Sequence, residues 1–90
     1  MEYSEKNLGK ILKDMYENAP KNEQILMINL FGVKFGSIIK LRGYNAGNIV
    51  RYAGLSNWYR AEVSKGVKLS KYVVIKESQD KLLDRMFGEE

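Results

Sequence analysis

Apolar residues near the start of the chain recur at intervals of three and four positions, as one face of an α-helix requires. These residues are Leu8, Ile11, Leu12, Met15 and Tyr16. Ser4 is a good N-cap in front of this stripe, and Pro20 disfavours the α conformation in the residue before it. The pattern therefore predicts a helix from about residue 5 to 18.

Two further apolar segments are predicted to be strands. Residues 24–31 form a run too short to show a period, so a buried strand and the start of a helix both fit, and we favour a strand over residues 25–29. Residues 69–76 include the sequence Tyr-Val-Val-Ile, whose residue types favour strands. Because an isolated strand is unstable, we expect the two segments to pair.

A second helix is expected over residues 31–41, although Gly32 and Gly36 weaken it. Gly43 is a natural stop for this helix, and Asn45 is a natural N-cap for the next one. The chain between these two residues is therefore predicted to be a turn that separates two helices.

The next two predicted helices are short and closely spaced. Residues 46–53 predict the first, and Gly54 suits the left-handed conformation just past its end. Ser56 caps the second, which runs from residue 57 to about 65 and ends at Gly66. Two short helices joined by a tight turn are the layout of a helix-turn-helix (HTH).

The last apolar stripe predicts a C-terminal amphipathic helix over about residues 78–87. Its apolar residues are Leu82, Leu83, Met86 and Phe87. This helix would either cover the core or form a homodimer contact, and both alternatives stay open.

The whole chain, residues 1–90, is then one domain with its HTH core at about 46–66. We expect a mostly α fold with a small β component, either winged-helix-like with a short two-stranded sheet or a plain HTH bundle with a small strand pair.

The chain has no His and no Cys. This removes the commonest general base, the commonest zinc ligands and the thiol nucleophile. No cluster of acids and no Gly-rich phosphate motif replaces them, so we expect no enzyme, no metal and no cofactor.

No stretch approaches the ~20 apolar residues that span a bilayer, and the N-terminus lacks the layout of a signal peptide. We therefore expect a cytoplasmic protein with no membrane partner.

The net charge is +4, and the basic residues gather in the middle of the chain. Residues 24–76 hold nine Lys and Arg against Glu62 alone, a net charge of +8, whereas residues 1–23 and 77–90 carry −1 and −3. A polyanion such as DNA explains a segment of this kind, and so does a basic face that only keeps the protein soluble. Charge alone leaves both interpretations open.

The turn between the two short helices resembles the HTH of lactose-repressor-type regulators. There too an apolar helix ends in Tyr-Ala-Gly, here residues 52–54, and an aliphatic residue and a serine follow, here Leu55 and Ser56. The chain departs from that pattern at Arg60, where the regulators have an apolar residue. The resemblance implies binding of double-stranded DNA through the second helix and a role in transcription regulation.

A second resemblance covers more of the chain, from about residue 8 to 76. Residues 59–75, together with residues 30–35 and the turn at Ala53 and Gly54, are similar to a family of small bacterial proteins described as having an HTH-like domain. This resemblance implies the fold more than an activity.

A helical wheel with Tyr59 and Val63 facing inward places a polar, basic face on the opposite side of the second helix, with Glu62 toward the inner side. Residue types on this face can read bases or hold phosphates. The predicted contacts to bases or nearby phosphates are Asn57, Arg60, Ser64 and Lys65, and the predicted backbone contacts are Arg42, Arg51, Lys68 and Lys71.

The rival to DNA binding is a protein-protein interaction module built on an HTH-like scaffold. Its signature would be an exposed apolar patch around Trp58 or Phe87 in place of a basic face. Because Trp is usually well buried in folded proteins, we expect Trp58 to be partly buried.

Overall fold

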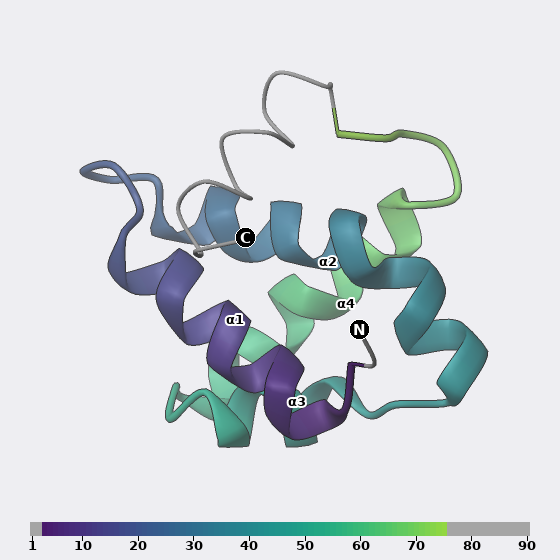
Figure 1. The fold of residues 1–90 in the computed structure, drawn as a ribbon. Helices are drawn as coiled ribbons and strands as arrows, with labels where there is room; N and C mark the ends of the chain where they lie inside the picture. The colour runs from purple at the N-terminus through teal and green to yellow at the C-terminus, as the bar shows by residue number, and fades with distance from the viewer. Residues whose placement is uncertain (1–2, 76–90) are drawn as a thin grey trace, which may run out of the picture.

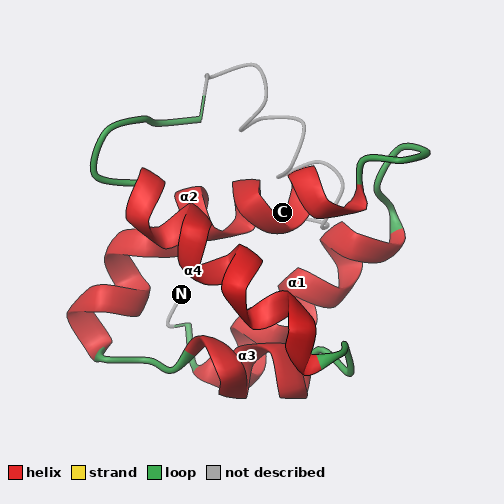
Figure 2. Ribbon diagram, turned by 180° about the vertical axis from the view of Figure 1, so that it is seen from behind, coloured by secondary structure: helices red, strands yellow, loops and turns green. Residues whose placement is uncertain are grey.

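The computed structural model describes residues 3–75, and every regular element in this range is helical (Figures 1 and 2). The chain order is α1 (Glu5–Glu17), α2 (Gln24–Arg42), α3 (Ala46–Tyr52), the short 3₁₀ helix η1 (Asn57–Tyr59) and α4 (Arg60–Leu69). The predicted C-terminal helix over 78–87 lies outside the described residues.

Helix α1 confirms the first prediction almost to the residue. The Ser4 hydroxyl accepts a hydrogen bond from the backbone N–H of Asn7 at 3.1 Å, and the Asn7 side chain accepts one from the Ser4 backbone N–H at 3.4 Å. This reciprocal cap satisfies two backbone donors that a helix start leaves open. The apolar stripe then buries Leu8, Leu12 and Met15 completely.

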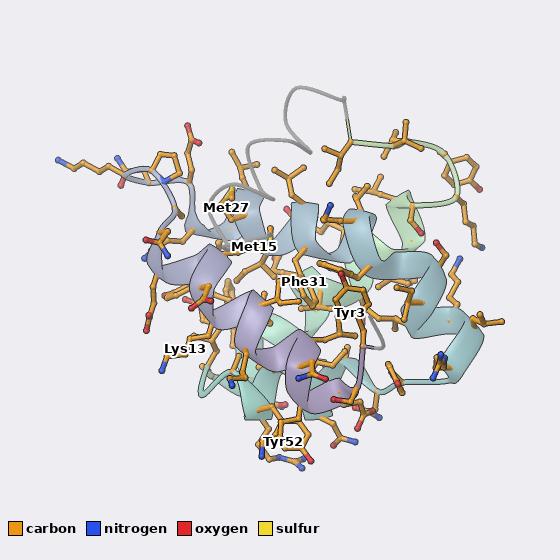
Figure 3. The ribbon with its side chains drawn as sticks, in the orientation of Figure 1. Tyr3, Lys13, Met15, Met27, Phe31 and Tyr52 are labelled. Carbon is orange, nitrogen blue, oxygen red and sulfur yellow. The ribbon has the colours of Figure 1, made fainter. Side chains whose placement is uncertain are left out.

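Helix α2 lies through the middle of the domain and supplies more buried core residues than any other described helix. Its buried residues are Met27, Ile28, Phe31, Gly32, Phe35, Gly36 and Ile39. In Figure 3, Phe31 points into the space between α1 and α2, toward Met15. By length and apolar composition alone α2 could cross a membrane, a test that the core helix of a soluble protein also passes. Because α1 and α4 pack against it, its apolar character is here that of a core helix.

The predicted strand over residues 25–29 is wrong, because these residues form the first turns of α2. Met27 and Ile28 continue into Phe31 and Phe35 at intervals of three and four, so one helix buries the whole set. The helix ends as predicted at Gly43, whose φ of 65° is the left-handed conformation of a helix C-terminus. The first apolar run was too short on its own to reveal this period.

The predicted strand over residues 69–76 is also wrong within the described range. Helix α4 extends to Leu69, and the backbone N–H groups of Tyr72 and Val73 both donate to the Leu69 carbonyl in a closing turn. Residues 73–75 form no regular element, and residues 3–75 contain no strand. The two-stranded sheet and the winged-helix variant are therefore corrected to an all-helical, HTH-like fold.

The turn between α3 and α4 has the predicted chemistry. The Asn45 side chain caps α3 by accepting from the Asn48 backbone N–H at 3.1 Å, and Gly54 has a φ of 73°. The Ser56 hydroxyl accepts from the backbone N–H of Trp58 at 3.2 Å. The second helix starts later than predicted, because residues 57–59 form η1 before α4 begins.

Gly66 does not end the second helix but lies within α4, buried against α2. A methyl group on Gly32 would lie 2.6 Å from the Val63 carbonyl oxygen and 2.7 Å from the Gly66 Cα atom. A methyl group on Gly66 would overlap the Asn29 carbonyl oxygen. The glycines therefore allow the backbones of α2 and α4 to touch, and this helix pair forms the most extensive contact between described elements.

The close contact predicts that Gly32→Ala destabilises the domain. Alanine favours a helix interior over glycine by roughly 0.5–1 kcal/mol, whereas overpacking of a tight contact costs about 1–3 kcal/mol. We expect a net loss of stability in urea unfolding, with Ser37→Ala on the exposed side of α2 as the control. A Gly32→Ala variant as stable as the wild type would contradict the proposed contact.

Candidate nucleic-acid interface

The outward face of α4 is basic. Val63 is fully buried and Tyr59 packs against the core, as the helical wheel predicted. The exposed side chains of the helix are Arg60, Ala61, Lys65, Lys68 and Leu69. Ser64, which was predicted to lie on this face, is half-buried at its edge.

The start of this face is held close to α3. A methyl group on Gly47 would lie 3.4 Å from the Arg60 Cδ atom and 4.0 Å from the Asn57 side-chain oxygen. A shallow hollow of about 90 Å³ adjoins this contact and is lined by Gly47, Val50, Arg51, Leu55 and Asn57. The structure therefore brings three of the predicted residues, Arg51, Asn57 and Arg60, to one place beside the HTH turn.

A second hollow of about 340 Å³ lies where α2, α3 and α4 meet. Its lining residues are Ile39, Lys40, Gly43, Tyr44, Ala46, Ser64, Val67 and Lys68. Two of its lining residues are basic, Lys40 from α2 and Lys68 from α4. Lys40 was not among the predicted contacts, because only the folded chain places the end of α2 beside the second HTH helix.

The only acid on α4 is turned toward α2 and is paired. The Asn29 amide donates to the Glu62 carboxylate and to the Glu62 backbone carbonyl, at 3.0 Å in each case. Lys65 lies 3.2 Å from the same carboxylate, whose side chain is 16% exposed. The Asn29 hydrogen bond, and then Lys65, lower the pKa of Glu62. Lys65 is thus partly neutralised, although its side chain is 60% exposed.

The start of α3 is already occupied by a carboxylate. Glu5 of α1 accepts from the Asn45 backbone N–H at 2.8 Å and from the Asn48 side-chain amide at 3.3 Å. A helix N-terminus often binds a phosphate, but here an acid of the same chain fills that role. A phosphate at the start of α3 would therefore have to displace Glu5.

The last two predicted backbone contacts lie at the ends of helices. Arg42 is exposed in the final turn of α2, and Lys71 is exposed just after α4. Neither Arg42 nor Lys71 lines the two hollows described above, so the structure does not bring them together with Arg51, Asn57 and Arg60.

This arrangement of a capped short helix, a left-handed glycine and a second helix with a basic face agrees with the comparison with protein families. Residues 4–76 match the sequence profile of the family described as an HTH-like domain. The chain belongs to this family. No curated protein and no solved structure gives a significant match.

The HTH-like domain also presents an aromatic side chain that we expected to be partly buried. Trp58 is 62% exposed, so that expectation is wrong. Its ring lies 5.1 Å from that of Tyr59, whose hydroxyl is 3.1 Å from the Tyr16 hydroxyl. This hydrogen bond raises the pKa of Tyr59. Tyr59, which is hydrogen-bonded to Tyr16 of α1, packs against the Trp58 ring. Most of the Trp58 side chain is exposed to solvent.

Within residues 3–75, no group of three or more His, Cys, Asp or Glu side chains could hold a metal ion. The chemistry that the described site of the HTH-like domain offers is hydrogen bonding by amide, hydroxyl and guanidinium groups, together with positive charge.

The lowered pKa of Glu62 predicts a specific loss of stability in acid. Its folded-state pKa lies below the unfolded value of about 4.3, so its contribution is complete above that value and is lost as pH falls through the folded pKa. Between about pH 6 and pH 2.5, the Tm of the wild type should fall further than the Tm of Glu62→Gln. Glu17→Gln, at the exposed end of α1, is the control and should follow the wild type.

Proposed function

We propose that this HTH-like domain binds double-stranded DNA through the outward face of α4. The observation that carries the proposal is the charge of that face: Arg60, Lys65 and Lys68 are exposed on one short helix, and its only acid is turned inward. Membership of the HTH-like domain family supports this function but does not name a target.

The dimensions of α4 suit the major groove. An α-helix with its side chains is about 10–12 Å across and the groove is about 12 Å wide, so a helix such as α4 fits in it. At the leading end, the Asn57 amide can pair with adenine and the Arg60 guanidinium with guanine. Ser64 and Lys65 follow along the helix as further contacts to bases or nearby phosphates.

Phosphates on either side of the groove would then meet basic groups from other elements. Arg51 lies beside Asn57, and Lys40 and Lys68 flank the larger hollow. Arg42 and Lys71 would extend this contact along the backbone. Because a phosphate contact is mainly electrostatic, these residues are expected to set the affinity and its dependence on salt.

The proposal extends to a role in transcription regulation inside the cell, which the likeness of residues 52–56 to lactose-repressor-type regulators motivates. The 3₁₀ turn at Asn57–Tyr59 shifts the start of the second α-helix. For this reason base-reading positions are assigned from the geometry of α4 and are not transferred from those regulators.

A protein-protein interaction module remains the second candidate, because Trp58 is exposed. Tyr52 on α3 is also 54% exposed, and exposed Trp and Tyr side chains are typical anchors of protein interfaces. In that case Trp58→Ala would abolish binding of the partner while Arg60→Ala would leave it intact.

Titration of labelled duplex DNA of random sequence, followed by fluorescence anisotropy at two salt concentrations, tests the proposed function. We expect affinity to fall steeply with salt. Lys68→Ala should weaken binding to all sequences alike and reduce the salt slope by about one. Arg60→Ala, measured on a selected site, should cost about 1–3 kcal/mol and relax the preference at one base pair.

The matched control is Lys13→Ala, which removes the same charge from the exposed side of α1, at the edge of the molecule in Figure 3. It should retain the affinity and the salt slope of the wild type. No binding of DNA at low salt, or equal losses for Lys13→Ala and Lys68→Ala, would refute the proposed interface.

A further inference from the structure

The first half of α2 carries apolar side chains outside the core as well as within it. Although α1 and α4 pack against this helix, not all of its apolar side chains are buried. Ile25 is 40% exposed and Leu26 is 57% exposed, while Leu30 and Val33 are half-buried. The apolar stripe of a helix normally packs against another part of the protein. We call these four side chains the outer face of α2.

The chain after α4 returns to this outer face. A hollow of about 280 Å³ is lined by Val33, Lys34 and Ser37 of α2 on one side and by Ser70 and residues 73–75 on the other. Figures 1 and 2 both show the end of the described chain running back along α2. The described chain therefore ends beside α2, next to Val33 of the outer face.

Fifteen residues follow, and their sequence suits this surface. The apolar stripe predicted for residues 78–87 consists of Leu82, Leu83, Met86 and Phe87. A helix of ten residues is about 15 Å long, which matches the distance from residue 25 to residue 33 along α2 within about one turn. A linker of two residues, Lys76 and Glu77, connects this segment to the described chain.

The charges of the two parts are also complementary. Residues 3–75 carry twelve Lys and Arg against five acids, whereas residues 76–90 carry three against five. Attraction between the parts adds to the apolar contact, and the short tether keeps the segment at a high effective concentration near α2. Both effects favour the chain's own segment over a second copy.

We propose that residues 78–87 dock on the outer face of α2 within the same molecule, with their apolar stripe against Ile25, Leu26, Leu30 and Val33. The segment then completes the burial of the core helix. This inference is independent of DNA binding.

The test is Leu26→Gln in the full chain, because glutamine has a helix propensity close to that of leucine. If the outer face is covered, the variant buries a polar amide and Tm falls by at least about 5 °C. Leu41→Gln, at the far end of the same helix and 83% exposed, is the matched control and should leave Tm within about 2 °C of the wild type.

The partner side is tested with Leu83→Gln/Phe87→Gln. This double variant alone should lower Tm, as Leu26→Gln does. The triple variant that combines it with Leu26→Gln should lower Tm by clearly less than the sum of the two separate decreases, because both changes break the same contact. Mass in solution and the dependence of Tm on concentration distinguish the occupants. A monomer with this coupling supports the proposal. A dimer whose Tm rises with concentration, or additive effects, or no effect of Leu26→Gln, overturns it.

Discussion

The backbone contact between α2 and α4 determines the rest of this structure. Gly32 and Gly66 lie against each other, and a methyl group on either would meet backbone atoms of the other helix. Helices normally pack 8–10 Å apart, and glycines permit a closer approach in which one rotation of α4 fits best. That rotation buries Val63 and exposes Arg60, Lys65 and Lys68. The identity of the candidate interface therefore follows from two glycines that carry no chemistry themselves.

Polar chemistry at the same contact sets the charge of the interface. Asn29 sits among apolar residues of α2 and binds both the carboxylate and the backbone carbonyl of Glu62. An amide that satisfies the acid on the α2 side keeps it away from the outward face, where it would repel a polyanion. The glycine contact thus positions α4, and the Asn29 hydrogen bond holds the only acid of α4 on the side of α2.

Features that depend on a few neighbouring residues were predictable from sequence, whereas those that depend on a distant partner were not. The cap at Ser4, the stop at Gly43 and the turn at Gly54 are local, and all three are confirmed. Gly66 was interpreted as a helix stop because a glycine in a helix contact has the same local signature as one at a helix end. The strand predictions failed in a similar way, since residues 25–29 reveal their helical period only in register with residues beyond them. For the site, the wheel of α4 identified the basic face, but Lys40 and Asn29 come from another helix.

The two candidate functions meet at the start of α4, where Trp58 and Arg60 are close in sequence and both exposed. Their physics differs in a way that separates them. A contact made by Arg60 and the neighbouring lysines is Coulombic and weakens with salt, whereas burial of the Trp58 ring depends on removing apolar area from water and is nearly insensitive to moderate salt. Arg guanidinium groups also stack on aromatic surfaces, including bases, so a tryptophan beside an arginine is compatible with a nucleic-acid surface as well as a protein one. Asn29 holds Glu62 on the α2 side, so the exposed charges of α4 are cationic and suit an acidic partner such as the DNA backbone.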